Sequence, residues 1–249
     1  MGHCFSYEGV SEVAFSPDHL IIMAQEIEIK LLCRDEKVLK EIFFSQAVYP
    51  FLESKPMKMQ MEAYYLDTSN LNLSGAGYAF RLRREGHRWV AAIKRRKAYM
   101  HGLYDRDEWE KTIPFPKPDF EVFSDPELKK VLKSIVNGRP LIILCEVLME
   151  RICANVIFSD GTMIEVAADK GEIHSYGLLA LVSEVELELK SGAKDRLVEL
   201  SENLKKSYPL VEGAKSKYER GLNLFRRAVP EKLIEAEGFF RTLGMKIAY

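Results

Sequence analysis

The stretch Glu26-Ile27-Glu28-Ile29-Lys30 alternates strictly between charged and apolar side chains, within a longer alternating run from Ala24 to Leu32. Successive side chains of a β-strand point to opposite sides, so a period of two predicts a strand with one charged and one apolar face. Glu26, Glu28 and Lys30 therefore share one face, while the isoleucines share the other. The same pattern recurs along the chain and decides the expected fold.

The rest of the chain carries eight further runs that predict strands, so about nine are expected in all. The further strands are expected at Lys58–Asp67, Tyr78–Arg84, Trp89–Arg96, Tyr104–Lys111, Leu141–Ile157, Thr162–Asp169, Glu172–Tyr176 and Leu181–Lys190. Short turns such as Glu85-Gly86-His87 and Ser159-Asp160-Gly161 imply antiparallel pairing of consecutive strands. So many strands on one core favour a closed or nearly closed barrel over a flat sheet.

Helical patterns lie between and after the strands. Four helices are expected, at Asp35 to about Gln46, Asp125 to about Lys133, Ala193–Tyr208 and Ser216–Arg227. Asp125 precedes a proline that suits the first helical position, and the pattern after Pro230 is again weakly helical. The expected fold class is therefore α+β and β-rich, with a barrel whose helices pack outside.

Length, composition and net charge limit the number of domains and the class of protein. A chain of 249 residues fits one large domain or one domain with a small appendage. Its apolar fraction of 47% and charged fraction of 29% are ordinary for globular proteins. The net charge of −1 gives no support for a nucleic-acid or membrane-surface protein, so neither partner is expected. No stretch approaches the roughly 20 apolar residues of a membrane helix.

The four cysteines, Cys4, Cys33, Cys145 and Cys153, form no CxxC pair and no metal-type spacing with histidine. We therefore expect free thiols in a reducing, cytoplasmic compartment. The N-terminus, from Met1-Gly2, matches the loose N-myristoylation pattern. A simpler interpretation is preferred: Met23 directly precedes the first strand, so residues 1–22 are an extension from an upstream start codon.

Charged side chains are sorted by sign on the predicted strands. By parity, the rows that share a face are Arg81 with Arg83, Lys94 with Arg96, Arg106 with Glu108 and Glu110, Glu165 with Asp169, and Glu186 with Glu188 and Lys190. Each row alone is most simply explained as the solvated face of an amphipathic strand. Together they favour a charged barrel lumen, because the predicted helices can cover the opposite, apolar faces from outside.

A lumen that holds both acidic and basic groups must be hydrated, since unpaired buried charges are very costly. Arginine and lysine suit phosphate oxygens, whereas clustered carboxylates suit hard divalent cations such as Mg²⁺ or Mn²⁺. A polyphosphate bound to a divalent metal would pair with both the basic and the acidic side chains of the lumen. Nucleophilic catalysis finds less support, because the chain has no serine nucleophile elbow. The chain also has no Walker A sequence, which excludes an ordinary P-loop nucleotidase.

Several segments resemble motifs of one known family. The stretch Glu26–Lys30 resembles the ExExK signature of the CYTH superfamily, the triphosphate tunnel metalloenzymes. Five more segments resemble the family's motifs in chain order: Tyr64–Thr68, Arg81–Arg83, Ile93–Arg96, Glu186–Lys190 and Ser216–Gly221. The resemblance covers roughly residues 23–225, the expected domain. It implies an eight-stranded antiparallel tunnel that holds a triphosphate and a divalent metal.

Within the superfamily, the chain is most similar to bacterial inorganic triphosphatases. Gly102–Glu108 resembles their G-L-H-x-R-x-E stretch, with Tyr104 in place of the histidine. Ile164–Ile173 resembles their I-E-x-A-x-D-x-G-E-I run, with Ala168 where leucine is usual. The resemblance implies hydrolysis of tripolyphosphate to pyrophosphate and phosphate. Many such enzymes carry a C-terminal helical CHAD domain, so residues 226–249 are interpreted as a helical tail or the start of a truncated second domain.

The roles expected from this resemblance divide into two groups. Acidic residues are expected to hold metal: Glu186 and Glu188 at the phosphates, Glu26 and Glu28 at a second metal or the attacking water, Asp169 completing a site, and Glu108 and Glu165 as further ligands. Lys30 is expected to orient the water or bind the terminal phosphate. The remaining phosphates are expected to bind Arg81, Arg83, Lys94, Arg96, Arg106, Arg151, Lys190 and Lys217.

Several alternatives stay open at this point. Glu108 would instead orient Arg106, Glu110 would be a surface residue, and Arg151 would form an exterior ion pair with Glu150. The rival functions are a class IV adenylate cyclase, a thiamine triphosphatase, and a non-catalytic module that binds polyphosphate or nucleotide. A pure binder has little use for the four carboxylates at Glu26, Glu28, Glu186 and Glu188. The preferred metal, the physiological substrate and the oligomeric state are not decided by the sequence.

Overall fold

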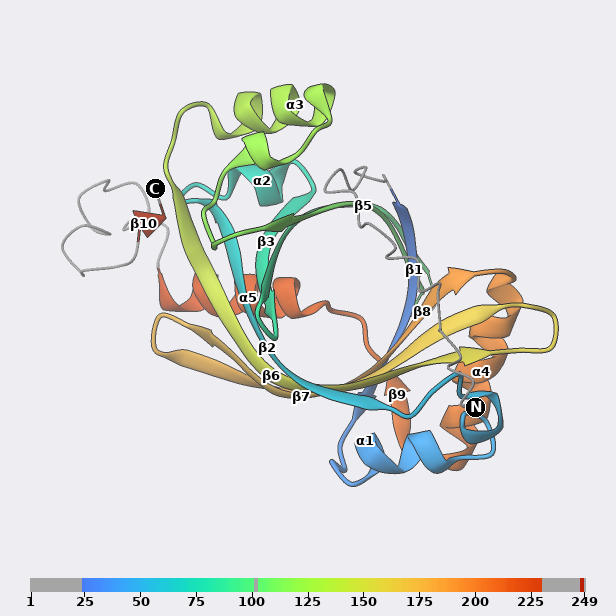
Figure 1. Cartoon of the computed structure of the whole chain (residues 1–249). Coiled ribbons are helices and arrows are strands. Elements are labelled where there is room, and N and C mark those ends of the chain that lie inside the picture. Colours follow the sequence, from blue (N-terminus) through green and yellow to red (C-terminus); the bar gives the residue numbers. More distant parts are fainter. Residues whose placement is uncertain (1–23, 101–102, 230–246, 249) are drawn as a thin grey trace, which may run out of the picture.

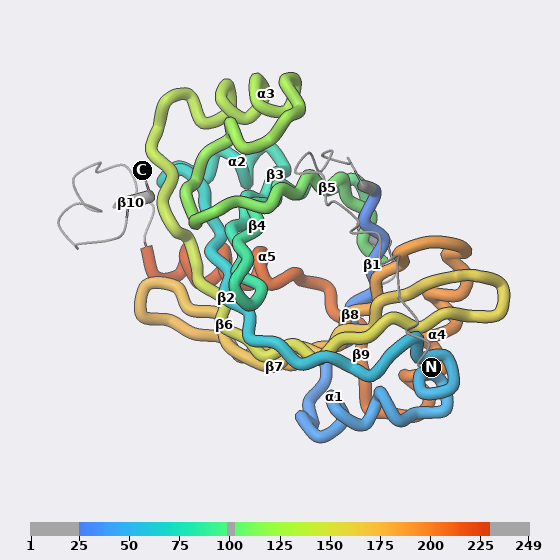
Figure 2. The backbone as a smooth tube through the Cα atoms, in the orientation of Figure 1, coloured from blue at the N-terminus to red at the C-terminus, as the bar shows by residue number. Residues whose placement is uncertain are grey.

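Eight long antiparallel strands form a closed barrel in the computed structural model, which describes residues 24–100, 103–229 and 247–248 (Figure 1). They are β1 (Ala24–Cys33), β2 (Met57–Thr68), β3 (Tyr78–Glu85), β4 (Arg88–Met100), β5 (Leu103–Ile113), β6 (Leu141–Ile157), β7 (Met163–Ser175) and β8 (Leu178–Ser191). Their order is β6-β2-β3-β4-β5-β1-β8-β7, and pairing of β6 with β7 closes the ring, as the backbone tube shows (Figure 2). The predicted eight-stranded antiparallel barrel is confirmed.

The predicted break between Thr162–Asp169 and Glu172–Tyr176 was wrong, because β7 is continuous through both segments. Gly171, which falls between the two predicted strands, lies opposite Met149 of β6. A Cβ atom there would stand 2.1 Å from the Leu148 carbonyl oxygen and 2.5 Å from Met149 Cα. The glycine therefore allows two strands to approach closely and does not end one. Two short strands were not predicted: β9 (Leu210–Glu212) pairs with β1, and β10 (Ile247–Ala248) pairs with β6.

Three of the four predicted helices form close to the expected positions. The α-helices are α1 (Val38–Glu41), α2 (Asn72–Gly75), α3 (Pro126–Val136), α4 (Lys194–Ser207) and α5 (Lys217–Ala228), with 3-10 turns at Ile42–Phe44, Tyr49–Phe51 and Phe120–Val122. The helix expected from Asp35 to Gln46 is only α1 and the first of these 3-10 turns. It ends at Ser45, whose backbone is extended and whose hydroxyl donates to the Ile42 carbonyl at 2.6 Å.

Helices α1 to α4 cover apolar faces of the barrel from outside, as predicted (Figure 1). Outward side chains of β1, β7 and β8, such as Ile29 and Leu187, pack with those of α1 and α4 in one core cluster. Outward side chains of β3 and β4, such as Phe80 and Ile93, pack with α2 and α3 in a second cluster. Each fully buried aliphatic or aromatic side chain contributes roughly 1.5–3 kcal/mol relative to exposure. The opposite faces are thereby turned into the lumen.

The Tyr64–Thr68 segment has a structural role at the end of β2. Asp67 is fully buried, and its carboxylate accepts backbone N–H groups of Thr68 at 2.7 Å, Leu73 at 2.8 Å and Ser74 at 2.8 Å. It thus satisfies donors at the start of α2, which would otherwise be unpaired. Burial raises the pKa of Asp67, and these hydrogen bonds oppose that shift.

Some predictions lie outside the described residues: those on residues 1–22, on Cys4, on Gly102, and on most of the tail from 230 onward. Cys33, Cys145 and Cys153 are free thiols. Within the ranges 24–100, 103–229 and 247–248, no helix is both long and apolar enough to span a membrane.

Replacing Gly171 by alanine tests the close approach of β6 and β7. The added methyl group meets backbone atoms that cannot rotate away, so we expect the free energy of unfolding to fall by about 1–3 kcal/mol. Gly75→Ala is the matched control, because nothing lies within 4 Å of a Cβ at that position, and we expect a change within about 0.5 kcal/mol. Urea unfolding followed by circular dichroism measures both; equal stabilities would contradict the account.

Candidate active site

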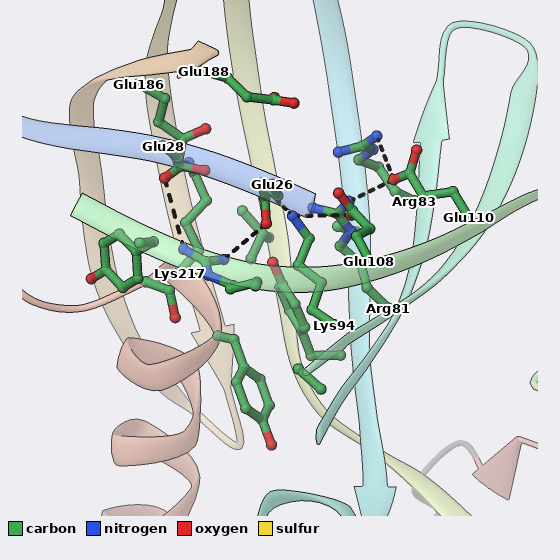
Figure 3. A pocket seen from close by; sticks show the side chains of 18 of the residues that line it. Glu26, Glu28, Arg81, Arg83, Lys94, Glu108, Glu110, Glu186, Glu188 and Lys217 are labelled. Atoms are coloured by element: carbon green, nitrogen blue, oxygen red, sulfur yellow. Dashed lines mark hydrogen bonds and ion pairs between the residues drawn. The ribbon is translucent and has the colours of Figure 1, made fainter. Parts of the chain in front are cut away.

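The barrel encloses a cavity of about 380 Å³ that is lined by the charged strand faces (Figure 3). Every predicted site residue except Asp169 lines it. These residues are Glu26, Glu28, Lys30, Arg81, Arg83, Lys94, Arg96, Arg106, Glu108, Arg151, Glu165, Glu186, Glu188, Lys190 and Lys217. Strand parity therefore places these side chains at one cavity, although it does not assign their roles.

Glu26 and Glu28 of β1 point into the cavity and are almost fully buried. Glu26 is bound by the ammonium group of Lys94, which holds its pKa below the usual value although burial acts in the opposite direction. Burial, together with the negative charge of Glu186, raises the pKa of Glu28 to about 7. One oxygen of each carboxylate, Glu26 Oε2 and Glu28 Oε1, has no hydrogen-bond partner among the described residues. Both oxygens still lie near cations: Arg106 is 3.7 Å from Glu26 Oε2, and Lys30 is 3.5 Å from Glu28 Oε1.

Glu186 and Glu188 of β8 differ in their surroundings. The Glu186 carboxylate binds Lys217 at 2.8 Å and Arg151 at 2.6 Å, and it also contacts Lys30. Burial opposes ionisation, but these three cations hold the pKa of Glu186 well below its usual value. Glu188 has only Lys190, at 2.8 Å, and burial raises its pKa. The negative charge of Glu188 is therefore balanced by fewer cations than that of Glu186.

The arrangement of carboxylates fits a divalent cation at one place better than at another. Glu28 lies opposite Glu188 in the register of β1 and β8, and Glu26 lies two residues further along the same face of β1. This group holds the two oxygens that lack a hydrogen bond to any described residue, and hard cations such as Mg²⁺ or Mn²⁺ take carboxylate oxygens. Ligand atoms of Asp169, Glu184 and Glu186 also lie within 4.8 Å of one another. That second group is already neutralised by lysine and arginine.

Basic side chains gather along β3, β4 and β5. Arg81 binds Glu110 at 3.1 Å, and Arg83 binds the same carboxylate at 3.3 Å. Lys94 binds Glu108 at 3.0 Å. The Nε atoms of Arg81 and Arg83 nevertheless lack hydrogen-bond partners, as does Nη2 of Arg106. Buried guanidinium donors without partners suit the oxygens of a phosphate chain.

The structure decides the alternative about Arg151 and leaves the one about Glu110 open. Arg151 does not form an exterior pair with Glu150: its guanidinium binds both oxygens of Asp169, at 2.7 and 2.6 Å, inside the barrel. Glu150 instead binds Lys58 at 2.7 Å. Glu110 lines the cavity and binds two arginines, although its side chain is 40% exposed.

Three predicted residues lie nearer the solvent. The Arg96 side chain is 62% exposed and pairs with Glu219 at 3.1 Å. Lys190 and Glu165 are 35% and 27% exposed and lie 3.8 Å apart. These positions place them at the rim of the cavity, whereas Lys30 is only 1% exposed at its inner end.

Lys217 reaches the cavity from α5, which packs against β6, β7 and β8. The helix begins with a capping box, in which the Ser216 hydroxyl and the Glu219 carboxylate each bind the other's backbone N–H group. Gly221 lies so close to Cys145 of β6 that a Cβ would stand 2.1 Å from its sulfur. This close packing of α5 on β6 places Lys217 Nζ 2.7 Å from Asp169 and 2.8 Å from Glu186.

Sequence reasoning missed two features of the site. Glu184 is fully buried and joins the charged cluster; it shares the parity of Glu186 and Glu188, so the strand period could have identified it. The second is an apolar wall of the cavity on β2 and β6. It consists of Met59, Met61, Ala63, Tyr65, Val147 and Met149. Apolar residues on a strand usually indicate core, and only the barrel closure shows that these line the lumen.

Comparison with known proteins identifies the fold family. The family model of the CYTH domain matches residues 24–222. A candidate adenylyl cyclase from Hippeastrum, described as having a dominant triphosphatase activity, is 20% identical, is aligned over 81% of this chain and 95% of its own, and has a TM-score of 0.54. A candidate adenylate cyclase from Bacillus halodurans is 15% identical over 78% and 96% of the two chains, with a TM-score of 0.49.

A protein from Pyrococcus horikoshii is 20% identical over 80% of this chain and 99% of its own, with a TM-score of 0.46. At these identities, the likeness to the Hippeastrum structure shows a shared fold and no more. The family model, however, spans the barrel from β1 to the middle of α5. The chain belongs to the CYTH domain family.

Proposed function

We propose that this protein is a metal-dependent hydrolase that converts tripolyphosphate to pyrophosphate and phosphate inside the barrel. One observation carries the proposal: carboxylate oxygens on β1 and guanidinium donors on β3 and β5, none of them hydrogen-bonded to a described residue, line the same buried cavity. A substrate that is both polyanionic and bound to a divalent cation satisfies both sets at once. The proposal includes magnesium or manganese as the metal and a triphosphate-containing small molecule as the partner.

Glu26, Glu28 and Glu188 would hold the divalent cation, with Glu186 beside them. When bound, the cation would neutralise phosphate charge and lower the pKa of a bound water molecule. Glu108 and Glu165 stay proposed further ligands, although Glu108 binds Lys94 and Arg81 here, at 3.0 and 3.4 Å. Both oxygens of Asp169 are taken by Arg151, and one is shared with Lys217, which favours a supporting role.

The basic residues would grip the phosphates that do not react. Arg81, Arg83 and Arg106 present donors without partners, so they can bind phosphate oxygens without first breaking a hydrogen bond at those atoms. Lys94, Arg151 and Lys217 would exchange some of their carboxylate contacts for phosphate. Phosphoryl transfer depends mainly on such positioning and charge neutralisation. Arg96 and Lys190, at the rim, would meet the incoming substrate.

The attacking water is assigned to the β1 end of the cavity. Glu28 has a raised pKa and an oxygen without a hydrogen bond to any described residue, and both features suit a group that accepts a proton from water. Lys30 lies 3.5 Å from Glu28 and contacts Glu186, so it would orient this region. In the absence of substrate its ammonium is already surrounded by carboxylates.

A second candidate is hydrolysis or cyclisation of an organic triphosphate, such as ATP or thiamine triphosphate. The apolar wall on β2 and β6 favours it, because methionine and tyrosine side chains suit the face of an aromatic group. Tyr65 lies opposite Arg81 in the register of β2 and β3, so an organic group on this wall would adjoin the phosphates. The fold alone does not distinguish hydrolysis from cyclisation, since the Hippeastrum protein is described both as a candidate cyclase and as having triphosphatase activity.

Substrate choice is tested with tripolyphosphate, ATP and thiamine triphosphate, each with magnesium, with manganese and with chelator. We expect metal-dependent phosphate release to be fastest with tripolyphosphate and to stop with chelator. Cyclic AMP as the main product would favour the cyclase. Tight binding of all three without any turnover would favour a binding module instead.

Glu28→Gln and Glu186→Gln test the carboxylates. Each variant keeps the side-chain shape but removes a charge from the proposed metal region, so we expect phosphate release from tripolyphosphate to fall to background. Glu150→Gln, on the outer face of β6, is the control and should keep full turnover. Circular dichroism checks that all three variants fold. Wild-type rates in both site variants would refute the metal assignment.

The raised pKa of Glu28 predicts a pH-dependent stability of the metal-free protein. The pKa is about 7 when folded against an ordinary 4.5, so the folded state binds more protons between these values. The contribution of Glu28 to the free energy of unfolding is therefore largest below pH 4.5 and is lost as the pH rises through 7. Between pH 6 and 8 the loss should be on the order of 1 kcal/mol.

Glu28→Gln removes the titrating group, so this pH slope should flatten in the variant. Urea unfolding in chelator at pH 6 and pH 8 measures the slope for both proteins. Added magnesium should restore stability to the wild type at pH 8 and less to the variant. Identical slopes in the two proteins would contradict the assignment.

A further inference from the structure

We propose that Glu184 is a positioning residue that fixes the ammonium groups of Lys30 and Lys217 at the inner end of the cavity. The inference rests on the proposed function, since it concerns how this site holds its cations. Glu184 belongs to none of the motifs that drew attention to the site. Its contacts nevertheless connect three separate elements: β8, β1 and α5.

Glu184 lies behind the cavity wall and not in it. Its side chain is fully buried and does not line the cavity, whereas Lys30 and Lys217 both do. Asp169, its cross-strand neighbour on β7, is also fully buried and absent from the lining. Substrate in the cavity would therefore touch the two lysines but not Glu184. Any influence of Glu184 on the reaction must act through them.

The carboxylate of Glu184 is fully engaged by cations. Oε1 lies 2.8 Å from Lys30 Nζ and 2.5 Å from Lys217 Nζ, and Oε2 lies 3.2 Å from Arg220 Nη1. Lys217 and Arg220 both belong to α5, so this one carboxylate also ties the helix to β8. Two flexible lysine side chains are thereby held with their charged ends together, against their mutual repulsion.

A metal-binding role for Glu184 is the main rival explanation. Its carboxylate lies near those of Asp169 and Glu186, at a spacing that could hold a cation. However, Lys217 lies within 2.8 Å of all three carboxylates, and Lys30 or Arg151 binds each of them as well. The cluster is thus occupied by ammonium and guanidinium groups, in contrast to Glu26 and Glu28, each of which keeps an oxygen without a hydrogen bond to any described residue.

Removing the charge of Glu184 should change turnover more than binding. In Glu184→Gln, Lys217 keeps Asp169 and Glu186, and Lys30 keeps Glu186 and Glu28, so both lysines still attract phosphate. Their ammonium groups are no longer fixed from behind, and misplacement of a reacting group by about 1 Å can cost about a hundredfold in rate. We expect kcat for tripolyphosphate to fall about tenfold to a hundredfold, with KM within about threefold of the wild type.

The experiment compares wild type, Glu184→Gln and the outer-face control Glu150→Gln with three measurements. The first is steady-state hydrolysis of tripolyphosphate, which separates kcat from KM. The second is calorimetric binding of Mn²⁺ alone. The third is nitrogen-15 NMR of lysine ammonium groups, in which only firmly held groups exchange slowly enough to be seen; signals that vanish in Lys30→Gln and Lys217→Gln identify the two lysines.

Lower kcat, unchanged Mn²⁺ affinity and loss of the two ammonium signals in Glu184→Gln would support the proposal. Weaker Mn²⁺ binding would overturn it in favour of a metal ligand, and unchanged kcat with a lower melting temperature would overturn it in favour of a purely structural role. If the wild type releases no phosphate, the proposed function fails, but the ammonium signals still test Glu184.

Glu184→Asp serves if the glutamine variant does not fold. It keeps the charge and withdraws the carboxylate by about 1.5 Å, one carbon–carbon bond. An intermediate loss of kcat, with weakened but detectable ammonium signals, would support positioning. Full turnover with both signals unchanged would overturn it.

Discussion

Mutual neutralisation of buried charges is the constraint on which the rest of this structure depends. Lys30 and Glu184 are almost fully buried, and either one left alone in the barrel would cost several kcal/mol. They are tolerated because β1, β8 and α5 place opposite charges within contact of each other. The barrel has to close, and α5 has to be seated, before this compensation is complete.

The same constraint separates two layers of charge. Behind the cavity wall, Asp169 and Glu184 are saturated by cations, so this layer is fixed. At the wall, Glu26, Glu28 and Arg106 retain atoms without a hydrogen bond to any described residue, so this layer can accept new ligands. Preorganised sites require this arrangement, in which a fixed layer of buried charges supports the layer that lines the cavity. The groups that contact a ligand are then held in place by groups that do not contact it.

Much of the fold and most of the cavity lining could be predicted from the sequence, for a specific reason. In a strand, parity alone assigns a side chain to one face, and the amphipathic helices show which face is covered. The break predicted near Gly171 was wrong, since a sequence cannot show where two backbones approach closely. Glu184 was overlooked although it has the parity of Glu186. Parity gives the face but not the depth, so it could not show that Glu184 and Asp169 lie behind the cavity wall. Met61 and Tyr65 were missed because an apolar side chain looks the same in a core and in a lumen.

The pairing of β1 has a consequence for how the molecule assembles. Glu26 lies opposite Arg106 in β5, and Lys30 lies opposite Glu186 in β8, so the first strand finds its partners far along the chain. Contacts between such distant segments form slowly, because closing a large loop costs conformational entropy before the contacts stabilise the chain. Such contacts therefore tend to form together. During synthesis, the first strand can pair with β5 about halfway along the chain, but its other edge must wait until β8 has been made. The ring of strands, and with it the complete cavity, therefore forms only after nearly the whole domain has emerged.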